Sequence, residues 1–428
     1  MSNRIRSEDI PVPVIELCRT LARHGHRGWV VGGCLRDLLR GEQPADWDLA
    51  TSARPNEVQG IFPRVLPTGI QHGTVTVRHR GVGYELTTLR GEGAYSDGRR
   101  PDSVHFVTDI HEDLARRDFT INAIAYDPVA DRLEDPFAGL VDLDARILRA
   151  VGDPARRFGE DGLRVLRAAR FAATLEFALE PATEAAIEPS LDTFRRVSAE
   201  RVRDEWMKAL RARAPSRALD VMRRTGILAV TSPGLAALSD EAWASACAAV
   251  DTAPADPCMR LAALLWPLRD ELAEIDAWLA RYRFSNAERE RIGRMLRHAA
   301  PAELAGGSEG DVRRYARAVG REHLEEVASL ASIVTRAYDG EASAAHRDAR
   351  ALGERLATLV TLGTPLTARD LAIGGRELMQ EVDLPPGPAL GKLLEALLEL
   401  VLENPALNER ERLIEMARVL RAAVRVEE

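Results

Sequence analysis

The sequence predicts an α+β domain over roughly the first 145 residues and an all-α region over the rest of the chain. In the first part, short apolar and β-branched runs, at Trp29-Val30-Val31 and across residues 74 to 89, alternate with helical segments. From about Pro154 onward almost every segment has helical character, and Ala, Leu, Arg and Glu dominate the composition. Because such a shift in composition marks a domain boundary, we expect the chain to divide there.

Length and composition set the outer bounds of this prediction. With 428 residues, 46% of them hydrophobic, the chain has room for a sizeable core and several domains. No apolar run approaches the length of a membrane span, and the start of the sequence lacks the apolar core of a signal peptide. We therefore expect a cytoplasmic protein without membrane contact. The cysteines are scattered without metal-ligand spacing and are expected to be free thiols rather than zinc ligands: Cys18, Cys34, Cys247 and Cys258.

The first predicted element is an amphipathic helix over residues 8 to 27. Its apolar stripe consists of Ile15, Leu17, Leu21 and Ala22. A second short helix is predicted around Pro55 to Ile61, because the segment ARPNEV is typical of a helix start. Neither helix needs a catalytic role.

Between these two helices lies a turn suited to phosphate. The buried strand at residues 29 to 31 is followed by Gly32 and Gly33, which lead into CLRDLLR, a segment with helical spacing that stops at Gly41. Unpaired backbone N–H groups at a helix start attract phosphate, and glycine lets a triphosphate approach the backbone closely. We therefore predict that Gly32, Gly33 and Arg36 cradle phosphates.

A pair of carboxylates follows in Asp46-Trp47-Asp48. If this segment forms a strand, alternation places Asp46 and Asp48 on one face and Trp47 and Leu49 on the other. Converging carboxylates repel each other unless a cation lies between them, and hard oxygen ligands suit Mg²⁺ held partly by phosphates. An ordinary surface loop is the alternative, but the Gly-Gly helix start upstream favours a metal site.

A third carboxylate stands in a predicted hairpin. Residues 74 to 89 consist of two strand-like runs joined at Arg80-Gly81. In the second run Glu85 lies between Tyr84 and Leu86, so its side chain faces away from theirs and needs either solvent or a cation. Glu85 is the candidate third metal ligand, and a solvated edge-strand glutamate is the alternative.

Positive charge is local rather than general. The net charge is −8, yet ten basic residues stand against four acidic ones between Arg195 and Arg224. A biased genome composition explains much of the arginine content, but RNA binding requires only a local basic face.

Arginines also stand near the predicted site. Arg116 and Arg117 could neutralise charge on a transferring phosphoryl group. Asp118 and Asn122, just after them, could equally be a helix cap and a surface polar residue. Farther on, a helical segment carries three residues at a spacing that places them on one face, for which surface ion pairing is the commoner meaning: Asp161, Arg164 and Arg167.

These motifs together resemble one family. GGCLRDLLRG, DWDLAT, YELTTLR, DLARRDFTINAIA and EDGLRVLRAARF occur in the order and with the spacing typical of the class II tRNA nucleotidyltransferases, the CCA-adding enzymes, which share ancestry with bacterial poly(A) polymerases. The similarity runs from about Val30 to the C-terminus. It implies an α+β head with a nucleotidyltransferase fold, a small mixed sheet with helices, followed by an all-α neck, body and tail. The implied boundaries are 1–145 for the head, 146–235 for the neck, 236–350 for the body and 351–428 for the tail.

The resemblance also implies roles for individual residues. Asp46, Asp48 and Glu85 would be catalytic and would hold two Mg²⁺ ions. The Asp and Arg of the EDGLR segment would read the Watson–Crick edge of the incoming base, and the RRD segment would recognise ribose. The implied nucleotide-binding set is Gly32, Gly33, Arg36, Arg117, Asp118, Asn122, Asp161, Arg164 and Arg167. The implied RNA-binding set is Arg201, Arg203, Lys208 and Lys392, the last in the first turn of a tail helix.

The implied reaction is template-independent addition of C, C and A to the 3′ end of tRNA from CTP and ATP, with no obligatory protein partner. In this family the segment at residues 91 to 104 is a loop that tends to be shortened in enzymes adding only two cytidines, and here it has full length. An A-adding enzyme working beside a CC-adding partner, a bacterial poly(A) polymerase and an inactive RNA-binding relative remain alternatives.

Two structural expectations concern the later helices. Residues 198 to 206 have a capping signature at Ser198 and should brace the neck. In the body, Trp243, Trp266 and Trp278 are expected in the core. One helix side should carry four arginines that contact either phosphate or solvent: Arg289, Arg291, Arg294 and Arg297.

Overall fold

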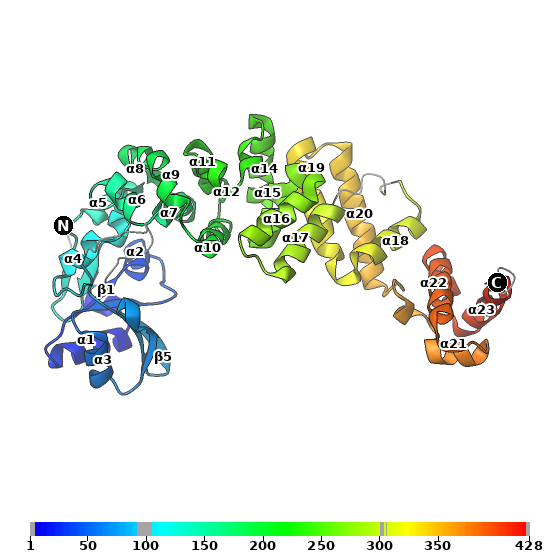
Figure 1. The fold of residues 1–428 in the computed structure, drawn as a ribbon, viewed down its shortest axis with the longest axis horizontal. Helices are drawn as coiled ribbons and strands as arrows, with labels where there is room; N and C mark the ends of the chain where they lie inside the picture. The colour runs from blue at the N-terminus through cyan, green and yellow to red at the C-terminus, as the bar shows by residue number, and fades with distance from the viewer. Residues whose placement is uncertain (1–4, 92–104, 300–303, 305, 425–428) are drawn as a thin grey trace. The chain divides into compact units, whose positions relative to one another are not determined.

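The computed structural model describes residues 5–91, 105–299, 304 and 306–424. The loop expected at residues 91 to 104 therefore lies, apart from Gly91, outside the described residues. The chain forms two compact units, Met1–Ala237 and Leu238–Glu428. The first contains the sheet and the second is built from helices (Figure 1). None of the described helices is long and apolar enough to span a bilayer.

A seven-stranded mixed sheet organises the first unit. The strand order is β3-β4-β5-β2-β1-β6-β7, and all neighbouring strands are antiparallel except β2 and β5. This arrangement confirms the predicted mixed sheet. Its strands are β1 (Gly28–Val31), β2 (Asp48–Thr51), β3 (Val65–Gly69), β4 (Thr74–His79), β5 (Val82–Thr88), β6 (Ala125–Asp127) and β7 (Arg132–Glu134).

Both faces of the interior strand β1 are buried, as its unbroken apolar run predicts. Val30 belongs to the core under α1 (Val12–Arg23) and α3 (Pro55–Ile61), whereas Trp29 and Val31 belong to the core under α4 (Ile110–Ala115). These helices cover the sheet. Helix α2 (Gly33–Leu39) follows β1 directly (Figure 1).

The stripe predicted for the first helix is confirmed at three of its four positions. Ile15, Leu17 and Leu21 are buried in α1, but Ala22 is exposed. Ala22 lies in the last turn, since the helix ends at Arg23, four residues earlier than predicted. Cys18 completes the buried stripe, and all four cysteines are buried free thiols, as predicted.

The predicted hairpin is confirmed. Strands β4 and β5 pair antiparallel up to His79 and Val82, so Arg80 and Gly81 form a two-residue turn. Both turn residues have positive φ, 50° and 84°, the conformation that matches the twist of the two strands. The predicted second helix is also confirmed, because α3 spans Pro55–Ile61.

Helices dominate the chain after the sheet, with one exception. β8 (Ile147–Leu148) and β9 (Ala178–Leu179) form a short parallel pair, so the all-α prediction is wrong at this point. The other elements that build this part are α5 (Gly139–Ala145), α6 (Pro154–Glu160), α7 (Leu163–Thr174), α8 (Pro181–Ala185), α9 (Leu191–Phe194), α10 (Ala199–Ala209), α11 (Ser216–Arg224), α12 (Ile227–Thr231) and α13 (Pro233–Ala236). Ser198 occupies the N-cap position of α10, but its side chain forms no capping hydrogen bond.

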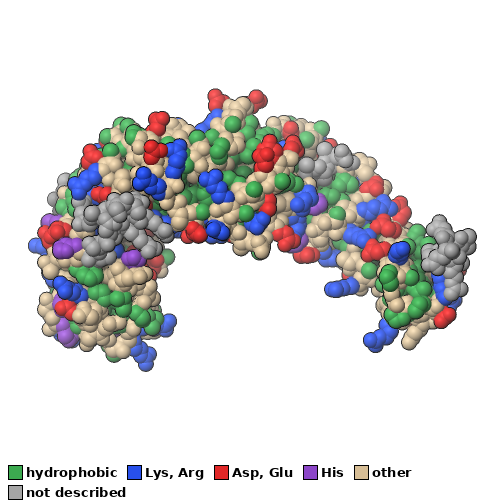
Figure 2. Space-filling model, viewed as in Figure 1, with side chains coloured by type: hydrophobic (Ala, Val, Ile, Leu, Met, Phe, Trp, Pro, Cys, Tyr) green, Lys and Arg blue, Asp and Glu red, His purple; other side chains and the backbone are tan. Residues whose placement is uncertain are grey.

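The second unit consists of helices in its described residues. They are α14 (Asp240–Thr252), α15 (Pro257–Leu265), α16 (Leu272–Arg281), α17 (Asn286–His298), α18 (Glu309–Val319), α19 (Leu324–Asp339), α20 (Ala344–Thr361), α21 (Gly375–Glu381), α22 (Pro388–Glu403) and α23 (Arg410–Val424). On the face drawn in Figure 2, acidic and basic side chains are interspersed over these helices.

Two of the three predicted core tryptophans are confirmed. Trp243 and Trp266 are buried, but Trp278 is only partly buried. Trp278 flanks the buried face of α16, where its ring lies 5.1 Å from the ring of Tyr282 and 6.0 Å from that of Phe284. Burial on α16 instead falls on Ile275 and Leu279.

The arginines of α17 are largely paired within the unit. Arg289 binds Asp276, Arg291 binds Asp256 and Glu326, and Arg294 binds Glu290. Such pairs occupy these guanidinium groups, and at the surface each contributes little stability.

Candidate active site

The turn after β1 has the geometry that its two glycines predict. Gly32 has φ 79° and ψ −141°, a conformation open to glycine but costly for other residues. A Cβ placed on Gly32 would lie 3.2 Å from Arg117 Nη1 and 3.8 Å from Asp48 Oδ2. Only glycine therefore leaves the space between this arginine and this carboxylate free.

The three predicted carboxylates come together beside this turn. Asp48 on β2 and Glu85 on β5 are direct neighbours in the parallel register. Asp46 lies in a bend two residues before β2, so the strand begins later than predicted. The predicted alternation nevertheless holds, because Leu49 is buried in the α1 core and Trp47 packs against it.

The three carboxylates interact electrostatically. Burial raises the pKa of Asp48 above its ordinary value, and the charges of Asp46 and Glu85 raise it further, while Arg117 partly opposes them. Mutual repulsion of this kind fits residues that would share a divalent cation. Across the described residues, no group of three or more His, Cys, Asp or Glu side chains is arranged to hold a metal ion. An open set of oxygen ligands suits Mg²⁺, which keeps water and substrate oxygens in its coordination shell.

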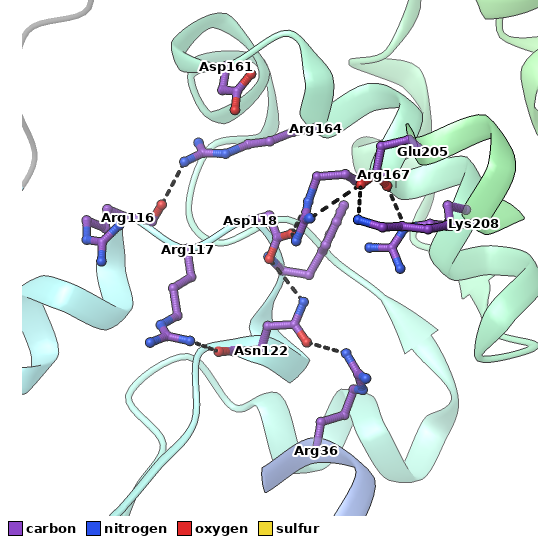
Figure 3. A network of polar contacts seen from close by, with 12 residues as sticks. Arg36, Arg116, Arg117, Asp118, Asn122, Asp161, Arg164, Arg167, Glu205 and Lys208 are labelled. Carbon is purple, nitrogen blue, oxygen red and sulfur yellow. Dashed lines mark hydrogen bonds and ion pairs between the residues drawn. The ribbon is translucent and has the colours of Figure 1, made fainter. Parts of the chain in front are cut away.

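A buried polar network, drawn in Figure 3, lines the same cleft as the three carboxylates. Asp118 accepts hydrogen bonds from Arg167 at 2.8 and 2.5 Å and from Asn122 at 3.0 Å, and Arg36 donates to Asn122 at 2.8 Å. Asp118 and Asn122 are 8% and 7% exposed. The interpretation of these two residues as a helix cap and a surface polar residue is therefore wrong. They join α2, the 118–122 segment and α7.

This network predicts a pH-dependent stability. Burial opposes ionisation of Asp118, but Arg167 and Asn122 outweigh it and hold its pKa below the ordinary 3.8. A depressed folded pKa stabilises the protein above the unfolded pKa, and this stability is lost as the pH falls toward the folded pKa. We therefore expect Asp118→Asn to be less stable than the wild type near neutral pH, with a difference that narrows below about pH 4.

Urea unfolding of both proteins between about pH 7 and about pH 3 measures this difference. Asp192→Asn is the control, because Asp192 is exposed and pairs with exposed Arg195, so its removal should change little at any pH. A wild-type advantage over Asp118→Asn that stays constant across this range would contradict the assignment.

The segment predicted to recognise the base is broken rather than continuous. Asp161 and Gly162 separate α6 from α7, so the prediction that Asp161 shares one helix with Arg164 and Arg167 is wrong. Asp161 accepts from Arg201 at 2.6 Å and from the N–H of Leu163 at 3.0 Å. A Cβ on Gly162 would lie 2.6 Å from backbone atoms of Thr193 and Phe194, so only glycine fits at this break. Asp161 lines the same cleft as Arg164 and Arg167.

Arg164 is fixed from two directions. Its Nη1 donates to Glu160 at 2.6 Å and to the carbonyl of Arg157 at 2.8 Å, and its Nη2 donates to the carbonyl of Arg116 at 2.7 Å. Only 9% of Arg164 is exposed. The predicted surface ion pair between Asp161 and Arg164 is absent among the described contacts, because each residue has a different partner.

Several residues of the site escaped sequence analysis. Glu205, 3% exposed, accepts from Arg170 at 2.5 Å and from Lys208 at 3.4 Å. Phe171 lies under three guanidinium groups, the nearest being that of Arg170 at 3.8 Å. Only the capping signature of residues 198 to 206, a segment that contains Glu205, gave a signal, and it was interpreted as structural.

One cleft of about 710 Å³ gathers these groups in the first unit. All twelve residues predicted for catalysis and nucleotide binding line it, together with Arg201 and Lys208 of the predicted RNA-binding set. Arg203 is not among the lining residues and binds Asp204. Lys392 belongs to the second unit, where it is the fifth residue of α22 and so stands beyond the predicted first turn.

Comparison with known proteins identifies this arrangement. The family model described as "Poly A polymerase head domain" matches residues 28–149, the model described as "Probable RNA and SrmB- binding site of polymerase A" matches 176–238, and the model described as "tRNA nucleotidyltransferase domain 2 putative" matches 239–417. A CCA-adding enzyme of Lactobacillus delbrueckii subsp. bulgaricus is 36% identical over 416 residues, which cover 95% of this chain and 97% of the relative. This chain belongs to the CCA-adding enzyme family.

Other members of the family agree over nearly the whole length. The CCA-adding enzyme of Geobacillus stearothermophilus is 34% identical over 415 residues, or 93% of this chain and 94% of the relative. The crystal structure of Bacillus stearothermophilus CCA-adding enzyme in complex with CTP matches with a TM-score of 0.77 and 32% identity, covering 97% of this chain and 98% of that one. The Thermotoga maritima CCA-adding enzyme complexed with tRNA, 21% identical with a TM-score of 0.65, shares the fold. The predicted nucleotidyltransferase fold is confirmed.

Proposed function

We propose that this CCA-adding family member adds C, C and A to the 3′ end of tRNA from CTP and ATP and releases pyrophosphate. One observation carries the proposal: the carboxylates of Asp46, Asp48 and Glu85, the turn at Gly32 and the arginines of the polar network line the same cleft. Structural relatives support the choice of substrates, since their titles name complexes with CTP, ATP and tRNA.

The three carboxylates are proposed to form the metal site. Asp46, Asp48 and Glu85 would hold two Mg²⁺ ions, and their mutual repulsion supports this assignment. When bound, the metal ions would lower the pKa of the attacking 3′-hydroxyl and neutralise the triphosphate. Gly32 leaves room for phosphate between Arg117 and Asp48, and the Arg117 guanidinium offers positive charge to it.

Selection of the base is proposed for Asp161 and Arg164. A carboxylate oxygen accepts from the exocyclic amine that C and A share, and a guanidinium donates to a ring nitrogen or carbonyl. Arg201 and Glu160 hold these two side chains at the cleft, so their positions are set before the nucleotide arrives. Arg117, Asp118 and Asn122 are proposed to recognise the ribose.

RNA contacts are proposed for both units. Arg201 and Lys208 line the cleft, where the 3′ end must enter, and Arg203 lies on the same helix. Lys392 is exposed on α22 of the second unit and offers a contact to a tRNA phosphate. We retain the division into head (1–145), neck (146–235), body (236–350) and tail (351–428) as part of this proposal.

Poly(A) polymerase activity is the second candidate, because the head-domain model carries that name. The match of residues 239–417 to a tRNA nucleotidyltransferase domain favours tRNA as the acceptor.

Three tRNA transcripts, ending before the tail, after C and after CC, distinguish these activities. Each is incubated with purified protein, Mg²⁺ and CTP, ATP or both. We expect all three to grow to one product ending in CCA. Extension of only the CC-ended transcript, by one A, would instead identify an A-adding enzyme, and a long ladder of adenosines on any RNA would identify a poly(A) polymerase.

A further inference from the structure

Helix α4 carries a buried carboxylate to which the proposed reaction gives no role. Asp113 is 1% exposed, although it lines the same cleft as the catalytic carboxylates. A buried carboxylate costs free energy unless hydrogen bonds and opposite charges compensate, so its partners indicate what it is for.

Its partners are the two arginines that follow it on the chain. Asp113 Oδ1 accepts from Arg116 at 3.0 Å (Nε) and 2.6 Å (Nη2), and Oδ2 lies 3.4 Å from Arg117 Nη2. Burial opposes ionisation, but both arginines outweigh it and hold the pKa of Asp113 below its ordinary value. Asp113 is thus an ionised acceptor shared by two guanidinium groups.

Asp113 and Arg116 together bind the backbone of Arg90, just after β5. The N–H of Arg90 donates to Asp113 Oδ1 at 3.1 Å, and Arg116 Nε donates to the carbonyl of Arg90 at 3.1 Å. Arg90 follows the end of β5 by two residues, and β5 carries Glu85. These two hydrogen bonds therefore fix the end of the strand that carries Glu85, the third carboxylate.

Arg117 through its side chain and Arg116 through its backbone carbonyl contact further residues of the cleft (Figure 3). Arg117 Nη1 lies beside Gly32 and donates to the carbonyl of Asn122 at 3.2 Å. The carbonyl of Arg116 accepts from Arg164 at 2.7 Å. Asp113 is connected in this way to the phosphate side of the cleft through one arginine and to the base side through the other.

We infer that Asp113 is a positioning residue for nucleotidyl transfer, which fixes the Arg117 guanidinium beside Asp48 and the end of β5 beside Glu85. It acts through these groups rather than on the nucleotide. The inference rests on the proposed function for the reaction that it serves, but not on which nucleotide is added.

Asp113→Asn is the informative substitution. Asparagine keeps an acceptor oxygen for Arg90 and Arg116 but presents an N–H₂ donor to Arg117 in place of a negative charge. Asp127→Asn is the matched control: Asp127 is also buried, at 4% exposure, binds Arg27 and accepts two backbone N–H groups, and it does not line the cleft.

Single-turnover and steady-state rates are measured with the CC-ended transcript and ATP, together with tRNA affinity and thermal stability. We expect Asp113→Asn to lower kcat by about tenfold, the lower end of what losing a supporting contact costs, with KM for ATP and tRNA affinity within about twofold of the wild type. Asp127→Asn should lose comparable stability and keep its kcat.

A double-mutant cycle separates positioning from general support. In an Arg117→Lys background, Asp113→Asn should cost much less than it does alone, because both act through the same guanidinium, whereas Asp127→Asn should behave additively. Equal kcat for the Asp113 and Asp127 variants, or additivity of Asp113→Asn with Arg117→Lys, would overturn the inference.

Failure of the proposed function looks different. If the wild type transfers any nucleotide, even as long poly(A) tails, the rate of that transfer can be compared between the wild type and Asp113→Asn. A wild type that transfers no nucleotide would overturn both proposals.

Discussion

Asp48→Asn is expected to abolish nucleotide transfer, with a loss on the order of 10³-fold or more in kcat, while tRNA binding stays within about twofold of the wild type. Asp48 is the carboxylate on which the charges of both Asp46 and Glu85 act, so its removal breaks the proposed metal site at its centre. Asparagine is nearly isosteric, so packing around β2 is retained. Rates of A addition to a CC-ended tRNA and a tRNA binding titration measure the two effects.

The same variant should be no less stable than the wild type in the absence of metal. A carboxylate whose folded pKa is raised destabilises the folded state where it is ionised, and asparagine removes that charge. Mg²⁺ should raise the thermal unfolding temperature of the wild type but not of Asp48→Asn, because only a bound ligand shifts it. Glu57→Gln, an exposed carboxylate on α3, is the activity control. An Asp48→Asn or Asp46→Ala protein that still extends tRNA would refute the assignment.

Gly162→Ala is expected to destabilise the first unit by about 2–3 kcal/mol, the usual cost of forcing extra volume into a packed interior. Gly162 has an ordinary helical φ of −57°, so the penalty comes from space alone. The added Cβ would meet backbone atoms of Thr193 and Phe194 at 2.6 Å, and backbone cannot move aside as a side chain can. Urea unfolding measured by circular dichroism gives the difference in free energy.

Gly159→Ala is the matched control for this prediction. Gly159 lies in α6, only three residues away, and a Cβ there meets nothing within 4 Å. Alanine should stabilise that helix by about 0.5–1 kcal/mol. The two substitutions should therefore have opposite signs, and a Gly162→Ala protein as stable as Gly159→Ala would show that α7 does not pack against Phe194 as described.

Local patterns predicted the elements that carry the site. The turn at Gly32 followed from the apolar run before it, and alternation around Trp47 placed both aspartates away from the core. The hairpin turn at Arg80-Gly81 followed from turn chemistry. In each case the deciding interaction lies within a few residues along the chain.

The predictions that failed depend on contacts between distant segments. At the break beside Asp161, Gly162 packs against the backbone of Phe194, more than thirty residues away, which sequence spacing cannot reveal. Asp113 and Glu205 are buried acids, and their arginine partners determine their orientation. The sequence around each acid is equally typical of an ordinary helix surface. Trp278 shows the same limit, because packing of α16 decides which of its faces is buried.

The parallel register between β2 and β5 has a consequence for how this part of the chain can vary. Asp48 faces Glu85, and Tyr84 and Leu86 on either side of Glu85 are buried in the opposite direction. Because side chains alternate with a period of two, a slip of one residue would bring an apolar side chain beside Asp48 and turn Glu85 into the core. Insertions and deletions between the two strands are therefore tolerable in connecting turns such as residues 62–64, where they leave this pairing intact. A single residue added inside β5 would turn Glu85, the proposed third ligand, away from Asp48 without changing any amino acid of the motif.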